Sequence, residues 1–213
     1  MENIASQRQT KYLQAPRLAY PEVLPLPKPT EDVEQAKIDL SDSGMCFLTN
    51  VLSASEVESI GGKLLRQADA ERALGDLAPP SSRVSKQGLS NLVNKGAEFL
   101  GLVEREEVDE LAGFVLGSSF LLSSLTGGVF NRVSPDPQQL HRDQGQVPAT
   151  ADFPAICNLF YVLDDFTPTR GSTCVIPGSH RWPPEYQVKP PPRGLEVQVE
   201  VPDLYLDQAG LRV

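Results

Sequence analysis

The period of the apolar residues changes from that of a helix to that of a strand near Gly117, and this change limits the fold to a few architectures. Residues 108–116 place apolar side chains at the i, i+3, i+4, i+7 spacing of a helix with one buried face. Residues 195–201 (LEVQVEV) instead alternate apolar and polar side chains, which is typical of a half-buried strand. Helices first and antiparallel strands later predict an α+β fold, with a β-sandwich or jelly roll that carries the site and with the helices packed on it.

Further elements follow from the same patterns on both sides of this boundary. Ser53 and Glu56 have the S-x-x-E spacing of a capping box, so a helix is expected to begin after Ser53. The other elements expected in the first half are helices at 31–40 and 108–116, a strand at 45–49 and a loop at 75–90. The strands expected in the second half lie at 120–125, 128–133, 156–163, 173–176 and 195–201.

The length and charge of the chain restrict its class and its partners. The 213 residues suit one domain, which we place at 31–213, after a polar, proline-rich extended arm at 1–30. The chain carries 28 acidic and 19 basic residues, a net charge of −9, and phosphate binding needs clustered Lys and Arg. Nucleic acid and anionic membranes are therefore not expected as partners. We also find no apolar run that could span a bilayer and no secretory signal, and we expect a cytoplasmic protein.

The cysteines and histidines limit the metal chemistry of the chain. The three cysteines, Cys46, Cys157 and Cys174, lack metal-type spacing and lie in apolar contexts, so we expect free, buried thiols. There are two histidines, His141 and His180. Any metal site made by this sequence must be built around one or both of them.

One of these histidines belongs to a candidate metal-binding motif. In an extended strand, residues i and i+2 point to the same side, so His141 and Asp143 can reach one metal ion together. An imidazole and a carboxylate are two of the three ligands of the facial triad that holds non-haem iron(II). The alternative is a surface histidine beside a solvated aspartate. Arg142, between the two, is expected to point away from the metal and to serve packing or a salt bridge.

Three segments, in the same order, resemble the phytanoyl-CoA dioxygenase family of iron(II)- and 2-oxoglutarate-dependent enzymes. They are residues 43–53 (SGMCFLTNVLS), 138–144 (QQLHRDQ) and 164–182 (DDFTPTRGSTCVIPGSHRW). The second is most similar to the fungal secondary-metabolite branch of the family. The third departs from the family pattern at Arg170 and Ser172, where Asn and Ala are usual. The resemblance covers about residues 33–182, and it implies a double-stranded β-helix (jelly roll, cupin-like) core with the N-terminal helices packed on it.

The resemblance implies a role for each matching residue. His141 and Asp143 are implied as iron(II) ligands, and Gln138 and Thr173 as contacts of 2-oxoglutarate; no catalytic residue beyond the metal site is implied. Each of the last two has a structural alternative. Gln138 follows Pro137 and could cap a turn, and the Thr173 hydroxyl could bond to the backbone of its own strand.

The distal iron ligand and the arginine that pairs with 2-oxoglutarate have no match in this chain. In the family both lie on a later strand, and the PGSH histidine, here His180, is not an iron ligand. We therefore expect a structural or rim role for His180, and Arg212 lies too early to match the arginine. The expectation is a chain that lacks the last strands of the family: a truncated product, a splice or gene-model variant, or a subunit that depends on a partner.

The implied activity is oxidation of a C–H bond of a small lipophilic natural product in secondary metabolism, using molecular oxygen, iron(II) and 2-oxoglutarate. The first alternative is a non-catalytic homologue or the partner subunit of a heterodimeric dioxygenase, which the missing ligand favours. The second is a cupin-like metal-binding protein or isomerase, which does not explain the PGSHRW segment. Whether the chain is a monomer, a homodimer or a heterodimer is left open.

Overall fold

The computed structural model describes residues 24–74, 86–130, 141–148, 150–151, 153–167, 172–183, 195–196 and 204–207. Its helices are α2 (Val33–Ser43), α3 (Ala54–Ala73), α4 (Ala97–Val103) and α5 (Glu106–Leu116), with 3-10 turns η1 (Leu92–Asn94) and η3 (Ser179–Arg181). Its strands are β1 (Met45–Leu48), β2 (Lys86–Leu89), β3 (Gly127–Phe130), β4 (Asn158–Tyr161), β5 (Cys174–Val175), β6 (Leu195–Glu196) and β7 (Leu204–Asp207). The expected mixture of helix and strand is confirmed.

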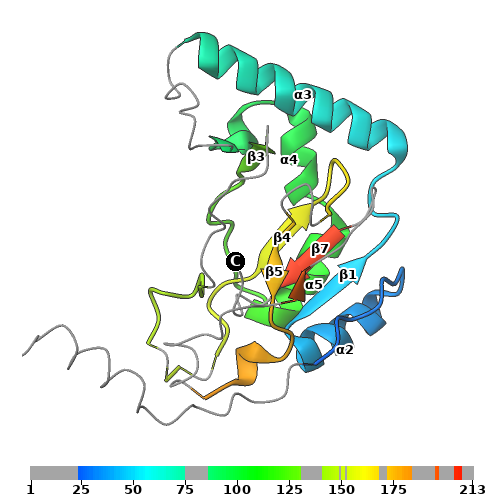
Figure 1. Ribbon diagram of the computed structural model, residues 1–213, viewed down its shortest axis with the longest axis vertical. Coiled ribbons are helices and arrows are strands. Elements are labelled where there is room, and N and C mark those ends of the chain that lie inside the picture. Colours follow the sequence, from blue (N-terminus) through cyan, green and yellow to red (C-terminus); the bar gives the residue numbers. More distant parts are fainter. Residues whose placement is uncertain are drawn as a thin grey trace, which may run out of the picture.

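The strands form three small antiparallel sheets (Figure 1). The largest has the order β1-β7-β4, so the last described strand lies between two earlier ones, with Phe47 opposite Tyr205 and Tyr205 opposite Phe160. The other two sheets are the pairs β2-β3 and β5-β6. The antiparallel pairing agrees with the expectation for this fold. The strand expected at 45–49 is β1, whereas β2 lies in a segment expected to be a loop.

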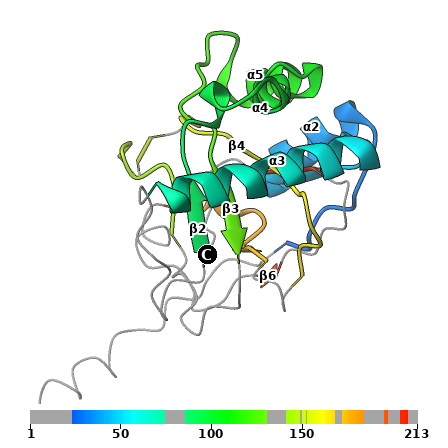
Figure 2. The ribbon, with the colours of Figure 1, turned by 90° about the horizontal axis from the view of Figure 1, so that it is seen from above.

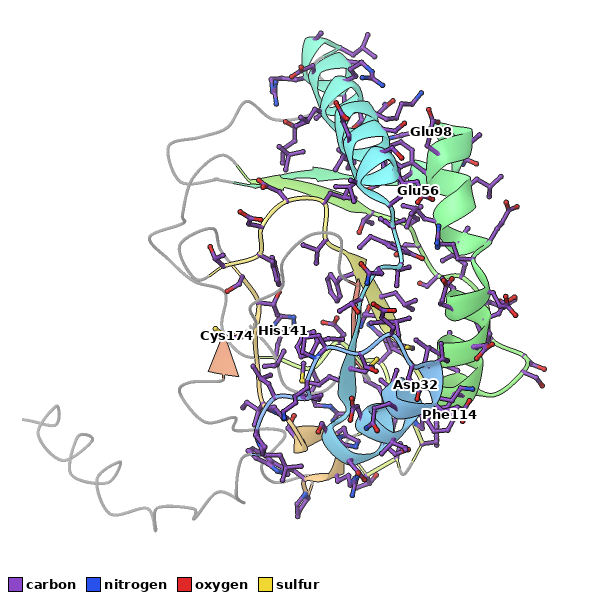
Figure 3. The ribbon with its side chains drawn as sticks, turned by 90° about the vertical axis from the view of Figure 1, so that its right-hand side faces the viewer. Asp32, Glu56, Glu98, Phe114, His141 and Cys174 are labelled. Carbon is purple, nitrogen blue, oxygen red and sulfur yellow. The ribbon has the colours of Figure 1, made fainter. Side chains whose placement is uncertain are left out.

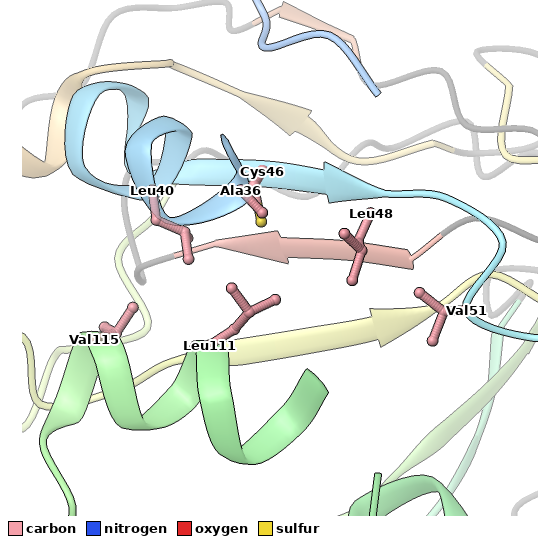
Figure 4. Packing of buried hydrophobic residues seen from close by; sticks show 7 residues of the cluster. All are labelled: Ala36, Leu40, Cys46, Leu48, Val51, Leu111 and Val115. Carbon is pink, nitrogen blue, oxygen red and sulfur yellow. The ribbon is translucent and has the colours of Figure 1, made fainter. Parts of the chain in front are cut away.

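Strand β1 is buried on both faces because its side chains alternate between two cores. Cys46 and Leu48 pack against α2 and α5, in a cluster that also holds Leu40 and Leu111 (Figure 4). Strand alternation sends Met45 and Phe47 to the opposite face. There they join Val162 of the segment after β4, Val175 of β5 and the partly buried Phe160 of β4. The three-stranded sheet thus has a helix-covered outer face and an inner face that looks toward β5.

A third cluster joins α3 and α4 to the β2-β3 pair. Ile60 and Ala68 of α3, Leu89 of β2 and Phe99 of α4 are all buried in it. Figure 2 shows α3 lying across β2 and β3. Tyr161 of β4 ties this region to the large sheet, because its hydroxyl donates to the Leu102 carbonyl at 2.7 Å.

The starts of the two helices that flank β1 are set by capping side chains. The predicted capping box is confirmed: the Glu56 amide donates to Ser53 Oγ at 3.3 Å, and the Ser53 amide donates to Glu56 Oε2 at 2.7 Å. Asp32 caps α2 by accepting from the Glu34 amide at 2.9 Å. Each cap satisfies amides that have no partner within the helix and stabilises it by about 1 kcal/mol.

In the described residues, two sequence predictions are wrong and one helix was missed. Residues 86–89, expected in a loop, form β2, whose sequence KQGL has no apolar alternation to reveal it. Helix α4 was not predicted. Residues 120–125, expected as a strand, contain no regular structure, and the side chains of Leu121 and Leu122 are 89% and 55% exposed. The apolar side chains of this segment are not buried against a sheet, so packing does not stabilise a strand there.

The end of the expected N-terminal arm contacts the domain. Residues 24–30 are extended, and Leu26 packs on the inner-face cluster of the large sheet. Thr30 makes a parallel bridge to Leu48, with the Thr30 amide donating to the Phe47 carbonyl at 3.0 Å. This contact covers the edge of β1 that is not paired with β7. The three cysteines are free thiols, as expected; Cys46 is buried and the other two are partly exposed. Among the described residues, none of the helices is long and apolar enough to cross a membrane.

Candidate metal site

His141 and Asp143 lie side by side, and their facing atoms are Nε2 of the imidazole and Oδ1 of the carboxylate, 3.1 Å apart. Their side chains are 37% and 28% exposed, so both remain accessible without being fully solvated. The i, i+2 spacing therefore places the two groups together. Neither lies in one of the named strands, although His141 makes a single β-bridge.

The pair lies on the inner face of the large sheet. Leu159 and Tyr161 of β4 contact the helix-side clusters, so alternation directs Asn158 and Phe160 to the other face. The Asn158 side-chain amide donates to Asp143 Oδ2 at 3.2 Å, which fixes Asp143 beside that face. In Figure 3, His141 lies on the side of the sheet that carries Cys174, and Phe114 of α5 lies on the opposite side.

The geometry of the two donors fits a divalent metal. Two ligands that occupy neighbouring positions of an octahedron, each about 2.1 Å from the ion, are about 3.0 Å apart. The observed separation of 3.1 Å between His141 Nε2 and Asp143 Oδ1 matches that value. Imidazole nitrogen with carboxylate oxygen is also the donor set of non-haem iron(II) sites. No cluster of three or more His, Cys, Asp or Glu side chains suited to a metal occurs within the described ranges, so the pair supplies two donors.

A buried glutamine, which the sequence did not reveal, holds the loop that follows the pair. Gln144 is 7% exposed, and its Oε1 accepts from the Ala155 amide at 2.8 Å while its Nε2 donates to the Phe153 carbonyl at 3.2 Å. The loop thus returns close to its starting point before β4 begins. Gln144 lies next to Asp143 in the sequence, but nothing in the residue pattern signals partners nine and eleven residues away.

Of the two residues expected to contact 2-oxoglutarate, the structure describes Thr173. Thr173 is partly buried directly before β5, and alternation puts it on the same face as Val175, which belongs to the inner-face cluster. That orientation is the one the expected contact needs. Gln138 lies outside the described residues.

The contacts of His180 place it against the end of α2. It lies in η3, where the preceding Gly178 amide donates to the Ser43 carbonyl at 2.7 Å. The His180 ring nitrogen Nε2 is 3.3 Å from the Ser41 carbonyl oxygen, at the end of α2. Arg181 donates to the same carbonyl and to the Asp42 carboxylate, which places its positive charge at the negative end of the helix. These contacts agree with the structural role expected for His180.

Gly44 leaves the room that the His180 ring occupies, and this gives a testable prediction. Gly44 ends α2 with a φ of 77°, and a Cβ there would lie 2.7 Å from Cγ of the ring. Gly44→Ala is therefore expected to lower the free energy of unfolding by about 1–3 kcal/mol, from left-handed strain and the clash. Urea unfolding measures the change.

Gly61→Ala provides the matched control. Gly61 lies inside α3, and a Cβ there would meet nothing within 4 Å, so alanine is expected to stabilise the chain by about 0.5–1 kcal/mol. Equal effects of the two substitutions would contradict the proposed packing of His180 on Gly44.

The burial of His180 gives a second prediction, on pH. Burial lowers the pKa of the imidazole below 6.5; the Ser41 carbonyl raises it, Arg181 lowers it and Asp42 raises it by smaller amounts. Between the lowered pKa and 6.5 the unfolded chain binds a proton that the folded chain does not. The free energy of unfolding is therefore expected to fall as the pH drops below about 6.5. Urea unfolding of the parent and of His180→Gln at pH 7.5 and 5.5 tests this, and an equally large loss in the variant would contradict it.

Known proteins share the sequence pattern and the mixed helix–strand fold of this chain. The family model of phytanoyl-CoA dioxygenase (PhyH) matches residues 40–199. This match covers most of the chain, and the chain belongs to the phytanoyl-CoA dioxygenase family. The resemblance found in its motifs is thereby confirmed.

A curated relative and several solved structures are similar to this chain. The dioxygenase sphC of Aspergillus fumigatus is 28% identical over 188 residues, 79% of this chain and 51% of the relative, so the chain spans about half the length of that relative. AviO1 from Streptomyces viridochromogenes has a TM-score of 0.62 at 22% identity, covering 86% of this chain and 87% of that one. The carbocyclase SnoK from nogalamycin biosynthesis, described as non-haem and alpha-ketoglutarate-dependent, has a TM-score of 0.63 at 20% identity and coverages of 87% and 79%. HygX from Streptomyces hygroscopicus, solved with nickel and 2-oxoglutarate bound, has a TM-score of 0.59 at 19% identity. The match covers 84% of this chain and 78% of HygX. At these identities the structures show a shared fold.

Proposed function

We propose that this chain forms the iron- and 2-oxoglutarate-binding part of a dioxygenase that oxidises a C–H bond of a small lipophilic natural product. The observation that carries the proposal is the 3.1 Å approach of His141 Nε2 and Asp143 Oδ1 on the inner face of the sheet. A surface histidine beside a solvated aspartate, the plain alternative, does not explain why Asp143 is also held by an amide of β4. Membership of the phytanoyl-CoA dioxygenase family supports the same reading.

In such a site, different residues bind the iron, contact 2-oxoglutarate and exclude water. His141 and Asp143 hold the iron(II), and Thr173 and Gln138 contact 2-oxoglutarate. Iron(II) with 2-oxoglutarate supplies the oxidative chemistry, in which molecular oxygen and the co-substrate give succinate, carbon dioxide and an oxidised product. The buried Met45, Phe47 and Val175 form an apolar cluster on the same face of the sheet and limit the access of water from that side.

The substrate class rests on the relatives. SnoK is described as acting in nogalamycin biosynthesis, and the epimerase SnoN was solved with iron, alpha-ketoglutarate and a nogalamycin compound bound. These are natural products, not acyl-CoA esters. The similarity to the fungal dioxygenase sphC favours the same branch of the family for this chain.

Metal-dependent binding of 2-oxoglutarate tests the proposal. Equilibrium dialysis of radiolabelled 2-oxoglutarate is performed under anaerobic conditions with and without manganese(II), a redox-stable substitute for iron(II). Binding is expected with the metal, and its loss is expected both without the metal and in His141→Ala. Metal-independent binding, or binding that survives His141→Ala, would contradict the site.

A non-catalytic homologue or partner subunit is the second candidate, and one observation favours it. The chain has two histidines, and His180 contacts the end of α2, so one imidazole is available to the metal. A facial triad needs two. The turnover measurement argued in the Discussion separates the two candidates.

A further inference from the structure

We infer that Asn158 is a positioning residue that holds the Asp143 carboxylate in the rotation that directs Oδ1 toward His141 and the proposed metal site. The inference deepens the proposed function and rests on His141 and Asp143 being the metal ligands. It concerns how the second ligand is kept in a binding orientation. Nothing in the sequence motifs pointed to Asn158.

The two oxygens of Asp143 have different neighbours. Oδ1 lies 3.1 Å from His141 Nε2, and Oδ2 accepts from the Asn158 side-chain amide at 3.2 Å. A carboxylate that rotates about its last side-chain bond can direct either oxygen, or both, toward a divalent ion. The hydrogen bond from the Asn158 amide to Oδ2 favours the rotation in which Oδ1 faces the imidazole.

The chemistry of the asparagine side chain suits this task. An amide donates a hydrogen bond to the carboxylate without bringing a charge of its own. A lysine or arginine at this place would also hold Oδ2, but its positive charge would repel the metal cation and weaken its binding. Asn158 thus orients the ligand and leaves the negative charge of Asp143 available to the ion.

The backbone that carries Asn158 is itself fixed at two points. Asn158 begins β4 and is paired with Asp207 of β7, so it belongs to a hydrogen-bonded strand. The residues just before it are held by Gln144, whose buried amide bonds to Phe153 and Ala155. Gln144 follows Asp143 directly, so two hydrogen bonds hold the loop next to the proposed ligand. A ligand supported by such elements is held more precisely than one supported by a free loop.

Manganese(II) affinity separates a positioning role from a merely structural one. The full chain, Asn158→Leu and the control Asn94→Leu are titrated with manganese(II), and the free ion is measured by electron paramagnetic resonance. Asn94 is exposed and belongs to η1, whose buried Leu92 packs in the cluster of α3 and α4. Leucine is close to asparagine in size but donates no hydrogen bond, and loss of an outer-shell partner weakens metal binding about 10- to 100-fold.

We expect that loss for Asn158→Leu and less than about a twofold change for Asn94→Leu. The thermal unfolding midpoint without metal is expected to be similar in the two variants, because a structural role would lower it and a positioning role would not. If Asn158→Leu does not fold, Asn158→Ser serves in its place, since its shorter hydroxyl does not reach Oδ2 and the same loss is expected. Asn158→Gln, which keeps the amide, is expected to fall between the parent and Asn158→Leu.

The outcomes distinguish this inference from the proposed function. Affinity of Asn158→Leu within twofold of Asn94→Leu, while His141→Ala loses binding, would overturn the role of Asn158 and leave the metal site intact. Binding that is equal in the parent and in His141→Ala, or absent from the parent, would overturn the site and the inference with it. A weaker affinity that is matched by a lower unfolding midpoint without metal would assign Asn158 a structural role instead.

Discussion

Replacing either His141 or Asp143 by alanine is expected to abolish divalent metal binding by this chain, whereas His180→Ala is expected to leave the affinity within about twofold. The first two side chains face each other at 3.1 Å, and His180 contacts the Ser41 carbonyl at the end of α2. Outer-shell partners alone are worth about 10- to 100-fold in affinity, so loss of a direct ligand is expected to cost more than about a hundredfold. Titration with manganese(II), or with iron(II) under anaerobic conditions, measures the effect.

The stability of each variant needs its own measurement, because His180 also packs on Gly44. Thermal unfolding in the presence of a chelator shows whether the variant is folded at the titration temperature. If His180→Ala removed binding as completely as His141→Ala in a folded chain, the structural role of His180 would be wrong. A compact triad of another kind would then have to hold the metal.

The second large effect concerns turnover: the 213-residue chain by itself is expected to form succinate from 2-oxoglutarate at less than about 1% of the rate of a complete facial triad. The proposed site offers one imidazole and one carboxylate, and the other histidine of the chain, His180, is engaged at α2. The resemblance also gives no match for the arginine that pairs with the co-substrate. A bidentate charge-assisted pair of that kind is worth about 1.5–3 kcal/mol, or about 10- to 100-fold in affinity.

Succinate formation with iron(II), ascorbate and oxygen measures this turnover, for the chain alone and for the chain mixed with a homologous subunit. Activity that appears only in the mixture would support the view that a second polypeptide completes the site. Robust succinate production by the chain alone that His180→Ala abolishes would contradict both the count of ligands and the role given to His180. Production by the chain alone that His180→Ala leaves unchanged would contradict the need for a second imidazole.

The features that the sequence predicted well are those set by neighbours along the chain. The start of α3 follows from the spacing of Ser53 and Glu56, and the meeting of His141 with Asp143 follows from their i, i+2 spacing. Helix α5 follows from its apolar face. In each of these cases, a local conformation is enough to bring the groups together.

The features that were missed depend on contacts between distant segments. Three such contacts join residues that are far apart in the sequence or follow no regular spacing. They are the pairing of β1 with β7, the hydrogen bonds of Gln144 to the loop before β4, and the hydrogen bond from Asn158 to Asp143. Strand β2 was missed for a similar reason: its hydrogen bonds to β3 define it, and its side chains do not alternate. The proximity of His141 and Asp143 was therefore predictable from the sequence, while the contacts of Gln144 and Asn158 beside them were not.

The position of β7 in the large sheet has a consequence for how the protein folds. Strands β1 and β4 do not pair with each other; each pairs with β7, whose residues 204–207 follow every other described strand in the chain. During synthesis, β1 emerges early and has no strand partner in this sheet until β7 has been made. Contacts between residues so far apart in the sequence slow folding. An apolar strand that has not yet paired is also prone to aggregation. We infer that assembly of this sheet is a late step, and that the metal-binding pair, held by Asn158 of β4, becomes fully ordered only when that step is complete.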